Sequence, residues 1–434
     1  MMSSIWRTAP MPEFPPLEGD AKTDVLVIGG GMTGILCARL LTDAGVDCMV
    51  VERNTVGSGV SGNSTAKITA QRGLFAAELM KKVGRDRAGR AAREWRAAAE
   101  QLAVMSSGAD CDFHWADSCV YSRFDREILE REVEALGELG IYARLKEQLA
   151  LPFRTVGGVV VPDQGAFHPL KFLGEISKDL PVREHTAVTG VEGHTVRTER
   201  GIVTAEKIIV ATHFPFLDRM GGYFARLYQE RAYVLALADV PTVGGMYIDA
   251  QPEGLTFRDW GEIVIVAGGG HRTGKPTRGW RPLREFAGRY WPEGNELAAW
   301  ATQDCVTMDG LPYIGPYSGK EPHILVATGY QGWGMVGAMS AARILVEEVL
   351  GREHPCRDIF SPQRRMPIPK LAANGMEAAL DMLTPLTRRC PHLGCALRYN
   401  SEEHTWDCPC HGSRFERDGK LIQGPAQRSL GNGM

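Results

Sequence analysis

The sequence predicts an α/β domain built on a parallel sheet, an α+β domain interleaved with it, and a small all-β module at the C-terminus. Three observations lead to this fold class. A glycine-rich turn joins an apolar strand to a helix near the start of the chain. Strand and helix patterns then alternate as far as residue 350. Beyond a proline-rich stretch, cysteines and histidines cluster as expected of a separate metal-binding module.

Length and composition restrict the class of protein. The chain has 434 residues, 44% of them hydrophobic, which is enough for two or three domains with ordinary cores. The formal net charge is only −3, with both signs interspersed, so we expect neither nucleic acid nor an acidic membrane as partner. No segment has the pattern of a targeting leader or the apolar length of a membrane span. We therefore expect a cytoplasmic protein without a transmembrane segment.

The first functional pattern is the glycine-rich turn at 29–34. It follows an apolar strand at 24–28 and opens a helix that runs to residue 43, which is the context that G-x-G-x-x-G requires in a Rossmann-like dinucleotide site. Such glycines let the backbone approach a pyrophosphate, which binds at the helix N-terminus. Glu52 ends the next strand, where an acidic residue holds the ribose hydroxyls and disfavours NADP. The pattern alone leaves FAD and NAD both open.

The chain between this turn and residue 351 predicts mixed α/β structure. Helical spacing occurs at 85–107 and at 125–139. Short strand patterns occur at 157–161, 196–198 and 202–203. Two further apolar strands, 207–212 and 323–328, end in small residues, as expected where a sheet meets a cofactor. Residues 352–369 hold four prolines and many charges, which indicates a linker or an extended strap.

Residues 22–350 resemble the D-amino acid oxidase superfamily, which includes glycine oxidase and sarcosine oxidase. Segment 59–65 is similar to the family's Ser/Gly-rich segment around the pyrophosphate, 210–212 to its strand near the flavin, and 327–335 to its C-terminal glycine-rich loop. The resemblance implies FAD, bound by a Rossmann-like domain with an α+β substrate domain. Backbone amides of the last loop would stabilise the anionic reduced flavin. The implied FAD contacts are Gly29, Gly31, Met32, Thr33, Gly34, Glu52, Arg53, Ser61, Thr65, Ala211, Gly329, Gly332, Trp333, Gly334 and Met335.

Two departures from the family pattern are informative. Several family oxidases carry a lysine just after the glycine-rich loop, which promotes reaction with oxygen, whereas the nearest position here is Val336. The missing charge favours a dehydrogenase that passes electrons elsewhere. Cys305 does not match the spacing of the family's covalent flavin cysteine, so we expect FAD to be bound non-covalently and Cys305 to be a buried structural thiol.

A second cofactor pattern lies near the C-terminus, where Cys390-Pro-His-Leu-Gly-Cys395 is followed by Cys408-Pro-Cys-His-Gly-Ser413. Zinc also suits cysteine and histidine at short spacing. The two complete loops resemble those of a Rieske [2Fe-2S] domain, in which two cysteines bind one iron and two histidines the other. The ligands that this implies are Cys390, His392, Cys408 and His411. In Rieske proteins of the respiratory type the positions of Cys395 and Cys410 form a disulfide, which the sequence here leaves open.

Nearby residues suggest how the cluster is tuned. Ser413 resembles the serine that donates to cluster sulfur in high-potential members, whereas Phe415 stands where those members have tyrosine, so we expect a lower potential than theirs. Residues 424–426 resemble the loop that shields the cluster on its third side. A Rieske oxygenase would need a second iron with two histidines and a carboxylate, and the upstream histidines show no close pair.

The substrate residues are harder to predict. The family oxidises carbon-nitrogen bonds of amines, amino acids and N-methylated amino acids by hydride transfer to flavin. Our candidates are Tyr233, Arg258 and His271, with Arg258 as a bidentate clamp for a carboxylate. Ordinary structural roles compete for two of them: Arg258 as a surface or loop charge and His271 as a cap of the turn at Gly270.

The sequence thus predicts an FAD-dependent oxidoreductase whose electrons pass singly through the Rieske cluster to an external one-electron carrier, such as a ferredoxin or a quinone-linked protein. The reverse direction, a non-catalytic electron-transfer protein and a peroxide-forming oxidase remain alternatives. The predicted organisation is an N-terminal arm (1–21), the oxidoreductase (22–351, with FAD-binding segments at about 22–90, 185–220 and 305–351), a linker (352–375) and a Rieske domain (376–434).

Overall fold

A computed structural model describes residues 3–217, 220–251, 254–366, 376, 381 and 388–431. The predicted linker beyond residue 366, and residues 377–380 and 382–387 of the predicted Rieske domain, therefore lie outside the described residues. No helix within the described ranges has both the length and the apolar composition needed to cross a membrane.

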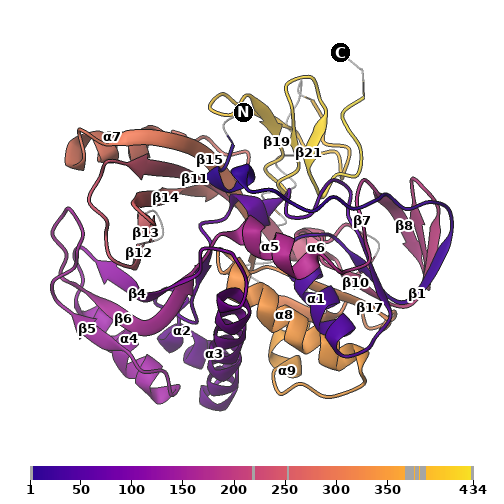
Figure 1. Ribbon diagram of the computed structural model, residues 1–434, viewed down its shortest axis with the longest axis horizontal. Coiled ribbons are helices and arrows are strands. Elements are labelled where there is room, and N and C mark those ends of the chain that lie inside the picture. Colours follow the sequence, from indigo (N-terminus) through magenta and orange to yellow (C-terminus); the bar gives the residue numbers. More distant parts are fainter. Residues whose placement is uncertain are drawn as a thin grey trace.

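The first sheet has eight strands and carries the glycine-rich turn at its centre (Figure 1). Its main path runs β16-β17-β10-β1-β2-β7, and β1 pairs in parallel with both β2 and β10. The strands of the path are β1 (Ala21–Ile28), β2 (Cys48–Val51), β7 (Val182–Arg183), β10 (Ile202–Val210), β16 (Tyr313–Pro316) and β17 (Ile324–Thr328), and β8 (Val188–Glu192) and β9 (Thr195–Thr198) extend it beside β10. The predicted strands at 202–203 and 207–212 form one strand, β10, because residues 202–206 continue the alternation of buried and exposed side chains.

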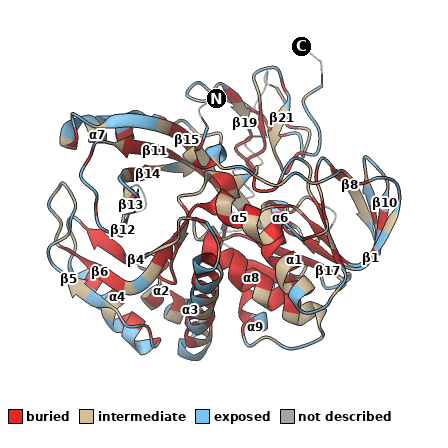
Figure 2. Ribbon diagram, viewed as in Figure 1, coloured by how far each residue is buried: buried red, intermediate tan, exposed pale blue. Residues whose placement is uncertain are grey.

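Two long helices follow strands of this sheet in the chain and pack against it. Helix α1 (Met32–Asp43) follows the glycine turn, and α8 (Gly334–Val349) packs beside it. Both helices are largely apolar and mostly buried, which places the main core of the molecule around them (Figure 2). Short helical segments complete this side of the fold: η1 (Ile5–Thr8), η2 (Val60–Asn63), α5 (Pro169–Ser177), α6 (Tyr223–Arg226) and α9 (Arg357–Phe360).

The second sheet has nine strands drawn from the two stretches of chain that interrupt the first sheet. Its order is β15-β11-β14-β13-β12-β4-β6-β3, with β5 beside β6. The strands are β3 (Lys67–Ile68), β4 (His114–Ser122), β5 (Arg144–Lys146), β6 (Gly157–Ala166), β11 (Leu227–Ala238), β12 (Met246–Asp249), β13 (Thr256–Trp260), β14 (Ile263–Arg272) and β15 (Asn295–Thr307). The accompanying helices are α2 (Ala76–Val83), α3 (Arg85–Ser107), α4 (Glu127–Glu138) and α7 (Arg281–Tyr290).

The C-terminal module is a small antiparallel sheet that sits above β11 and β15 (Figure 1, yellow). Its strands are β18 (Arg398–Asn400), β19 (Thr405–Asp407), β20 (Arg414–Phe415) and β21 (Leu421–Gln423). Its own core contains Cys390, Cys408 and Phe415. The predicted all-β module is therefore present and packed on the larger part of the chain.

Candidate functional site

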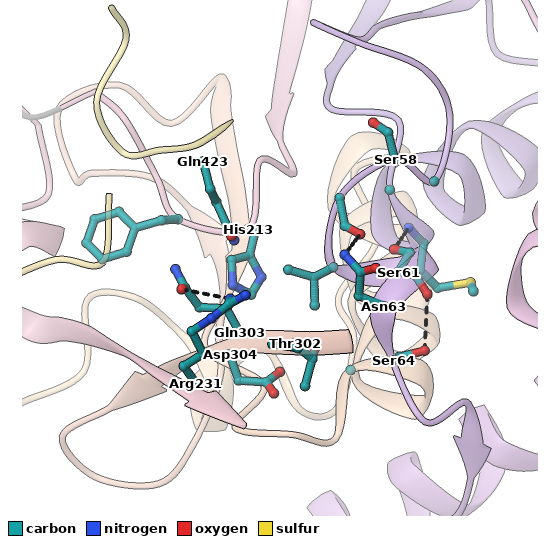
Figure 3. A pocket seen from close by; sticks show the side chains of 18 of the residues that line it. Ser58, Ser61, Asn63, Ser64, His213, Arg231, Thr302, Gln303, Asp304 and Gln423 are labelled. Atoms are coloured by element: carbon teal, nitrogen blue, oxygen red, sulfur yellow. Dashed lines mark hydrogen bonds between the residues drawn. The ribbon is translucent and has the colours of Figure 1, made fainter. Parts of the chain in front are cut away.

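One large cavity lies where the two sheets and the C-terminal module meet. Its volume is about 1380 Å³, which exceeds the roughly 300–1,000 Å³ of a typical small-molecule pocket and leaves room for an extended dinucleotide. Figure 3 shows Ser58, Ser61 and Ser64 on one side of this space, with His213 and Gln303 facing them from the other. The cavity therefore joins the dinucleotide turn to the region beneath the C-terminal module.

The glycine-rich turn is shaped by close contacts of its own backbone. A Cβ atom on Gly34 would lie 1.9 Å from the carbonyl oxygen of Gly29, and one on Gly29 would lie 2.7 Å from that of Ala211. Gly29 also has a φ of 112°, which side chains rarely allow. The N-cap of α1, Gly31, offers no side chain of its own, and Met32 N donates instead to the Ser61 hydroxyl at 2.9 Å, so this helix N-terminus and segment 58–65 meet where a pyrophosphate would bind.

Glu52 stands at the cavity wall beside this turn. Its carboxylate accepts hydrogen bonds from Gly30 N at 2.7 Å and from Asn54 N at 2.8 Å. Burial raises the pKa of Glu52, and these two bonds oppose that rise. Because an ionised carboxylate accepts about four hydrogen bonds, two acceptor positions are left for ribose hydroxyls.

Two further segments close the dinucleotide end of the cavity. The segment 58–65 is held by the N-terminal arm, since Trp6 Nε1 donates to Ser64 O at 2.8 Å and Arg7 donates to Ser58 O at 2.5 Å. The loop 327–335 is tied to α1 by a 3.0 Å hydrogen bond between the hydroxyls of Tyr330 and Thr33. The N-terminal arm therefore supports the site, a role that the sequence patterns did not suggest.

The predicted FAD contacts fall in two groups. Gly34 and Gly329 lie behind the wall, where Gly34 abuts Gly29 and a Cβ on Gly329 would lie 2.3 Å from Thr307. The others line the cavity, namely Gly29, Gly31, Met32, Thr33, Glu52, Arg53, Ser61, Thr65, Ala211, Gly332, Trp333, Gly334 and Met335. Val336 also lines it. Cys305 is buried outside the lining, where its thiol donates to His213 O at 3.3 Å.

The predicted substrate residues Tyr233, Arg258 and His271 lie outside the cavity lining, and their role in substrate binding stays a prediction. Ala232 lines the cavity, whereas Tyr233 lies outside the lining and stacks on His271 at a ring distance of 5.6 Å. His271 Nδ1 lies 3.0 Å from Gly269 O, as a turn cap does. The Arg258 guanidinium is fully buried and donates to the main-chain oxygens of Thr65, Ala66 and Phe167. These bonds give Arg258 a structural role, because they hold the main chain at the end of segment 58–65.

The second sheet supplies a different set of side chains to the cavity. They combine apolar surface with a few polar groups and are Lys67, Thr69, Ala232, Ile248, Thr256, Ala267, Trp300, Ala301, Thr302 and Asp304. Burial raises the pKa of Asp304 to about 6, although a hydrogen bond from the backbone of Gly332 partly lowers it. These residues come from strands far apart in the sequence, which is why no local motif revealed them.

The cysteine and histidine loops of the C-terminal module converge on one buried point. The imidazole rings of His392 and His411 lie 4.8 Å apart and almost perpendicular, and the thiols of Cys390 and Cys408 are neighbours that influence each other's pKa. Within the described residues, His411 Nδ1 is buried and has no hydrogen-bond partner, as expected of an atom that binds a metal. Cys395 and Cys410 form a disulfide, which takes them out of the possible thiolate ligands. The donor set of two thiols and two imidazoles fits a Rieske cluster.

The residues expected around the cluster also gather there. The Ser413 hydroxyl accepts from Ala426 N at 3.0 Å and also interacts with Cys390. Phe415 is fully buried in the module core. Ala426 follows Gly424 and Pro425, so the loop at 424–426 packs against the loop that carries His411 and Ser413.

Two buried glutamines join the module to the second sheet. Gln229 Nε2 donates to His411 O at 2.6 Å, and Gln303 Nε2 donates to Gly412 O at 2.8 Å and to Gln229 Oε1 at 2.8 Å. Gln303 also lines the cavity (Figure 3). The main chain at the predicted ligand His411 is therefore fixed directly to the cavity wall.

A buried ion-pair network fixes the same interface. Arg231 pairs with Glu403, and Arg414 pairs with both Glu403 at 2.9 Å and Asp407 at 3.0 Å. Burial alone would raise the pKa of Glu403, but Arg231 and Arg414 outweigh it and hold the pKa at about 2. Removing one member of a buried pair costs about 3–5 kcal/mol, so the network holds the module in one orientation.

Comparisons with known proteins agree with this architecture. The family model "FAD dependent oxidoreductase" matches residues 24–348, and the Rieske [2Fe-2S] domain model matches residues 380–432. The chain is 31% identical to the Rieske 2Fe-2S iron-sulfur protein YhfW of Bacillus subtilis (strain 168), over 98% of this chain and 96% of the relative.

Solved structures share the fold of the larger part. Glycine oxidase from Geobacillus kaustophilus superposes with a TM-score of 0.65 at 18% identity, covering 80% of this chain and 100% of that one. L-proline dehydrogenase from P. horikoshii gives a TM-score of 0.64 at 18% identity, covering 80% and 98%.

The fold and the site define a flavin-dependent oxidoreductase with an attached iron-sulfur module. The chain belongs to the FAD dependent oxidoreductase family that includes the D-amino acid oxidases, and it carries a C-terminal Rieske [2Fe-2S] domain. Its cofactors are FAD and the [2Fe-2S] cluster.

Proposed function

We propose that this oxidoreductase oxidises a carbon-nitrogen bond of a small amine, amino acid or N-methylated amino acid, and that the electrons leave singly through the Rieske cluster. The observation that carries the proposal is the position of Phe214. It lines the cavity, and its ring lies edge-on to both predicted histidine ligands, 6.5 Å from His392 and 6.0 Å from His411. The two predicted histidine ligands therefore lie on the side of the module that meets the cavity, which supports electron exchange between a cluster bound there and FAD bound in the cavity.

FAD would supply the hydride acceptor, and the chain would supply position and exclusion of water. The wall formed by Ala232, Ala267 and Trp300 gives the substrate an apolar surface. His213 stands between cavity and module, where burial lowers the pKa of its imidazole to about 4 and keeps it neutral near pH 7. His213 has a left-handed φ of 67°, and its carbonyl oxygen accepts from Cys305 and Thr328, so the imidazole is held in place.

The external acceptor in this proposal is a one-electron carrier such as a ferredoxin or a quinone-linked protein. Support comes from the partly exposed edge of the cluster loop, where Leu393 is 37% exposed beside His392. The cytoplasm stays the predicted location.

The test is anaerobic reduction of the purified chain by a panel of amines, amino acids and N-methyl amino acids, followed by visible absorption and low-temperature EPR. We expect one substrate to bleach the flavin and a Rieske-type EPR signal to follow. If no substrate bleaches the flavin while an external donor reduces the cluster first, electrons enter through the module and the proposed direction is wrong.

A further inference from the structure

The imidazole of His213 carries a buried nitrogen atom that no group in the described part of the chain satisfies. Its Nε2 atom is shielded from solvent and has no hydrogen-bond partner among the described residues. His213 lines the cavity, on the same side as Gln303 (Figure 3). Leaving a buried polar atom unpaired costs free energy, so an unpaired nitrogen at the wall of a ligand cavity indicates a partner on the ligand.

The main chain holds His213 in this position in a conformation that is rarely populated. Its φ is 67°, in the left-handed region that residues with a Cβ seldom adopt. Its carbonyl oxygen accepts hydrogen bonds from the Cys305 thiol at 3.3 Å and from the Thr328 hydroxyl. Residues held in this way cluster at functional sites, because only strong surrounding contacts keep them there.

The other nitrogen of the ring is directed to Gln229. Burial lowers the pKa of His213 to about 4, and a hydrogen bond with the Gln229 side chain opposes that shift. The imidazole is therefore neutral near pH 7 and has a single N–H. A hydrogen bond that raises the pKa of a histidine is one in which the ring donates, so the N–H belongs to Nδ1 and points to Gln229. Nε2 is then an acceptor that needs an N–H or O–H donor.

Two short connections lead from His213 to the cluster loop. Gln229 Nε2 donates to His411 O at 2.6 Å. Phe214, the next residue in the chain, places its ring 6.0 Å from the ring of His411 and 6.5 Å from that of His392. Because the surroundings of the ligands help to set the reduction potential of a Rieske cluster, a group that fixes His213 also acts on the cluster.

We propose that Nε2 of His213 accepts a hydrogen bond from an N–H or O–H group of FAD, and that this contact couples the two cofactor sites. FAD bound in the cavity fixes the imidazole and, through Gln229, the main chain at His411. The reduction potential of the cluster therefore differs between the chain with FAD and the chain without it. By linkage, one-electron reduction of the cluster changes the affinity for FAD by the same factor. The coupling depends on neither the substrate nor the direction of electron flow.

The test measures the reduction potential of the cluster in the full chain, by EPR during a redox titration. The potential is determined with FAD bound, after FAD has been removed, and after FAD has been added back. We expect a reversible shift that corresponds to a coupling factor of about fivefold or more. For a one-electron couple a tenfold factor is about 59 mV.

His213→Asn tests the Nε2 contact without changing the backbone. Asparagine tolerates the left-handed φ, but its shorter side chain has no atom at the position of Nε2. The shift on FAD binding should be largely lost, and the Kd for FAD should rise by about two- to tenfold, the usual loss for one hydrogen bond. His213→Gln restores an acceptor of similar reach and should recover most of the coupling.

His185→Asn is the matched control. His185 is also a left-handed histidine, with a φ of 49°, but it is exposed and lies outside the cavity lining. Its replacement should leave both the Kd for FAD and the shift in the cluster potential unchanged. The Rieske EPR signal shows that each variant is folded.

Two results would overturn the inference. One is a shift of the same size in the native chain and in folded His213→Asn, which would mean that the cluster senses only the charge of FAD. The other is a cluster potential in the native chain that does not respond to FAD. Bleaching of the flavin by a substrate plays no part in these measurements, so failure of the proposed function and failure of this inference are separate results.

Discussion

The two cofactor sites of this chain are built from different parts of the polypeptide. The dinucleotide turn is mainly backbone, where Gly29 and Gly34 approach other main-chain atoms too closely for a side chain. The cluster site is built from side chains, and its module is held to the second sheet by Gln229, Gln303 and Glu403. The first site should therefore be sensitive to an added methyl group, and the second to a lost polar group.

The largest effect should come from Gly34→Ala. The new Cβ would lie 1.9 Å from Gly29 O, so the turn must open, and FAD binding should be lost. The measurement is FAD content per chain, with the cluster EPR signal retained. Gly137→Ala, in α4 with no atom near its added methyl group, is the control and should bind FAD normally. A normal FAD content in Gly34→Ala would refute the backbone description of this site.

Cys408→Ser should have the opposite effect: it should remove the cluster and leave FAD binding intact. The variant loses a predicted thiolate ligand, so the Rieske EPR signal should vanish. The FAD content should stay within about twofold of normal, because this residue lies outside the cavity lining. Iron analysis and EPR check the first expectation, and flavin absorption checks the second. A retained Rieske signal would remove Cys408 from the ligand set.

Glu403 should make docking of the module dependent on pH. Its pKa is about 2 in the folded chain against an ordinary value of 4.5, so its stabilising contribution is complete above about pH 4.5 and is lost as the pH falls toward 2. Glu403→Gln should show the weakened docking already at pH 7, by about 3–5 kcal/mol. Hydrogen exchange of residues 388–431 reports docking, and an identical profile in both proteins would contradict this role.

Gln229→Leu should have a smaller and more specific effect. It leaves His411 O without its donor, and the resulting shift of the cluster loop should slow flavin-to-cluster transfer roughly tenfold while both spectra stay normal. Gln427→Leu removes another contact across the interface, the 2.7 Å bond from Arg53, and should leave the rate unchanged. Equal slowing in both variants would point to loosened docking instead of a specific link.

The smallest effect should come from Tyr233→Phe. The tyrosine lies outside the cavity lining and stacks on His271, so loss of its hydroxyl should change substrate-driven flavin reduction by no more than about twofold. Stopped-flow absorption measures the rate. A large loss would restore Tyr233 as a substrate residue.

Much of the fold was predictable because its signals are local. The glycine turn, Glu52 and the two cysteine-histidine loops are short runs in which neighbours in sequence are neighbours in space. The strands β11 to β15 went unnoticed, since buried runs with bulges lack a clear alternation and their register depends on distant partners.

The side chains that the second sheet contributes to the cavity could not be predicted for the same physical reason. Arg258 is suited by its chemistry to clamp a carboxylate, but long-range packing gives its donors to main-chain oxygens. Lys67 stands beside the recognisable segment 58–65, and only the pairing of β3 with β6 places it opposite Thr256.

The most direct test of an internal electron path is whether flavin and cluster exchange electrons within a single chain. The flavin would be reduced by one electron with a light flash, and reduction of the cluster would be followed at several protein concentrations. Contact of Phe214 and Gln303 with both sites predicts a first-order rate that does not depend on concentration. A rate proportional to protein concentration, or no cluster reduction at all, would contradict an internal path between the two cofactors.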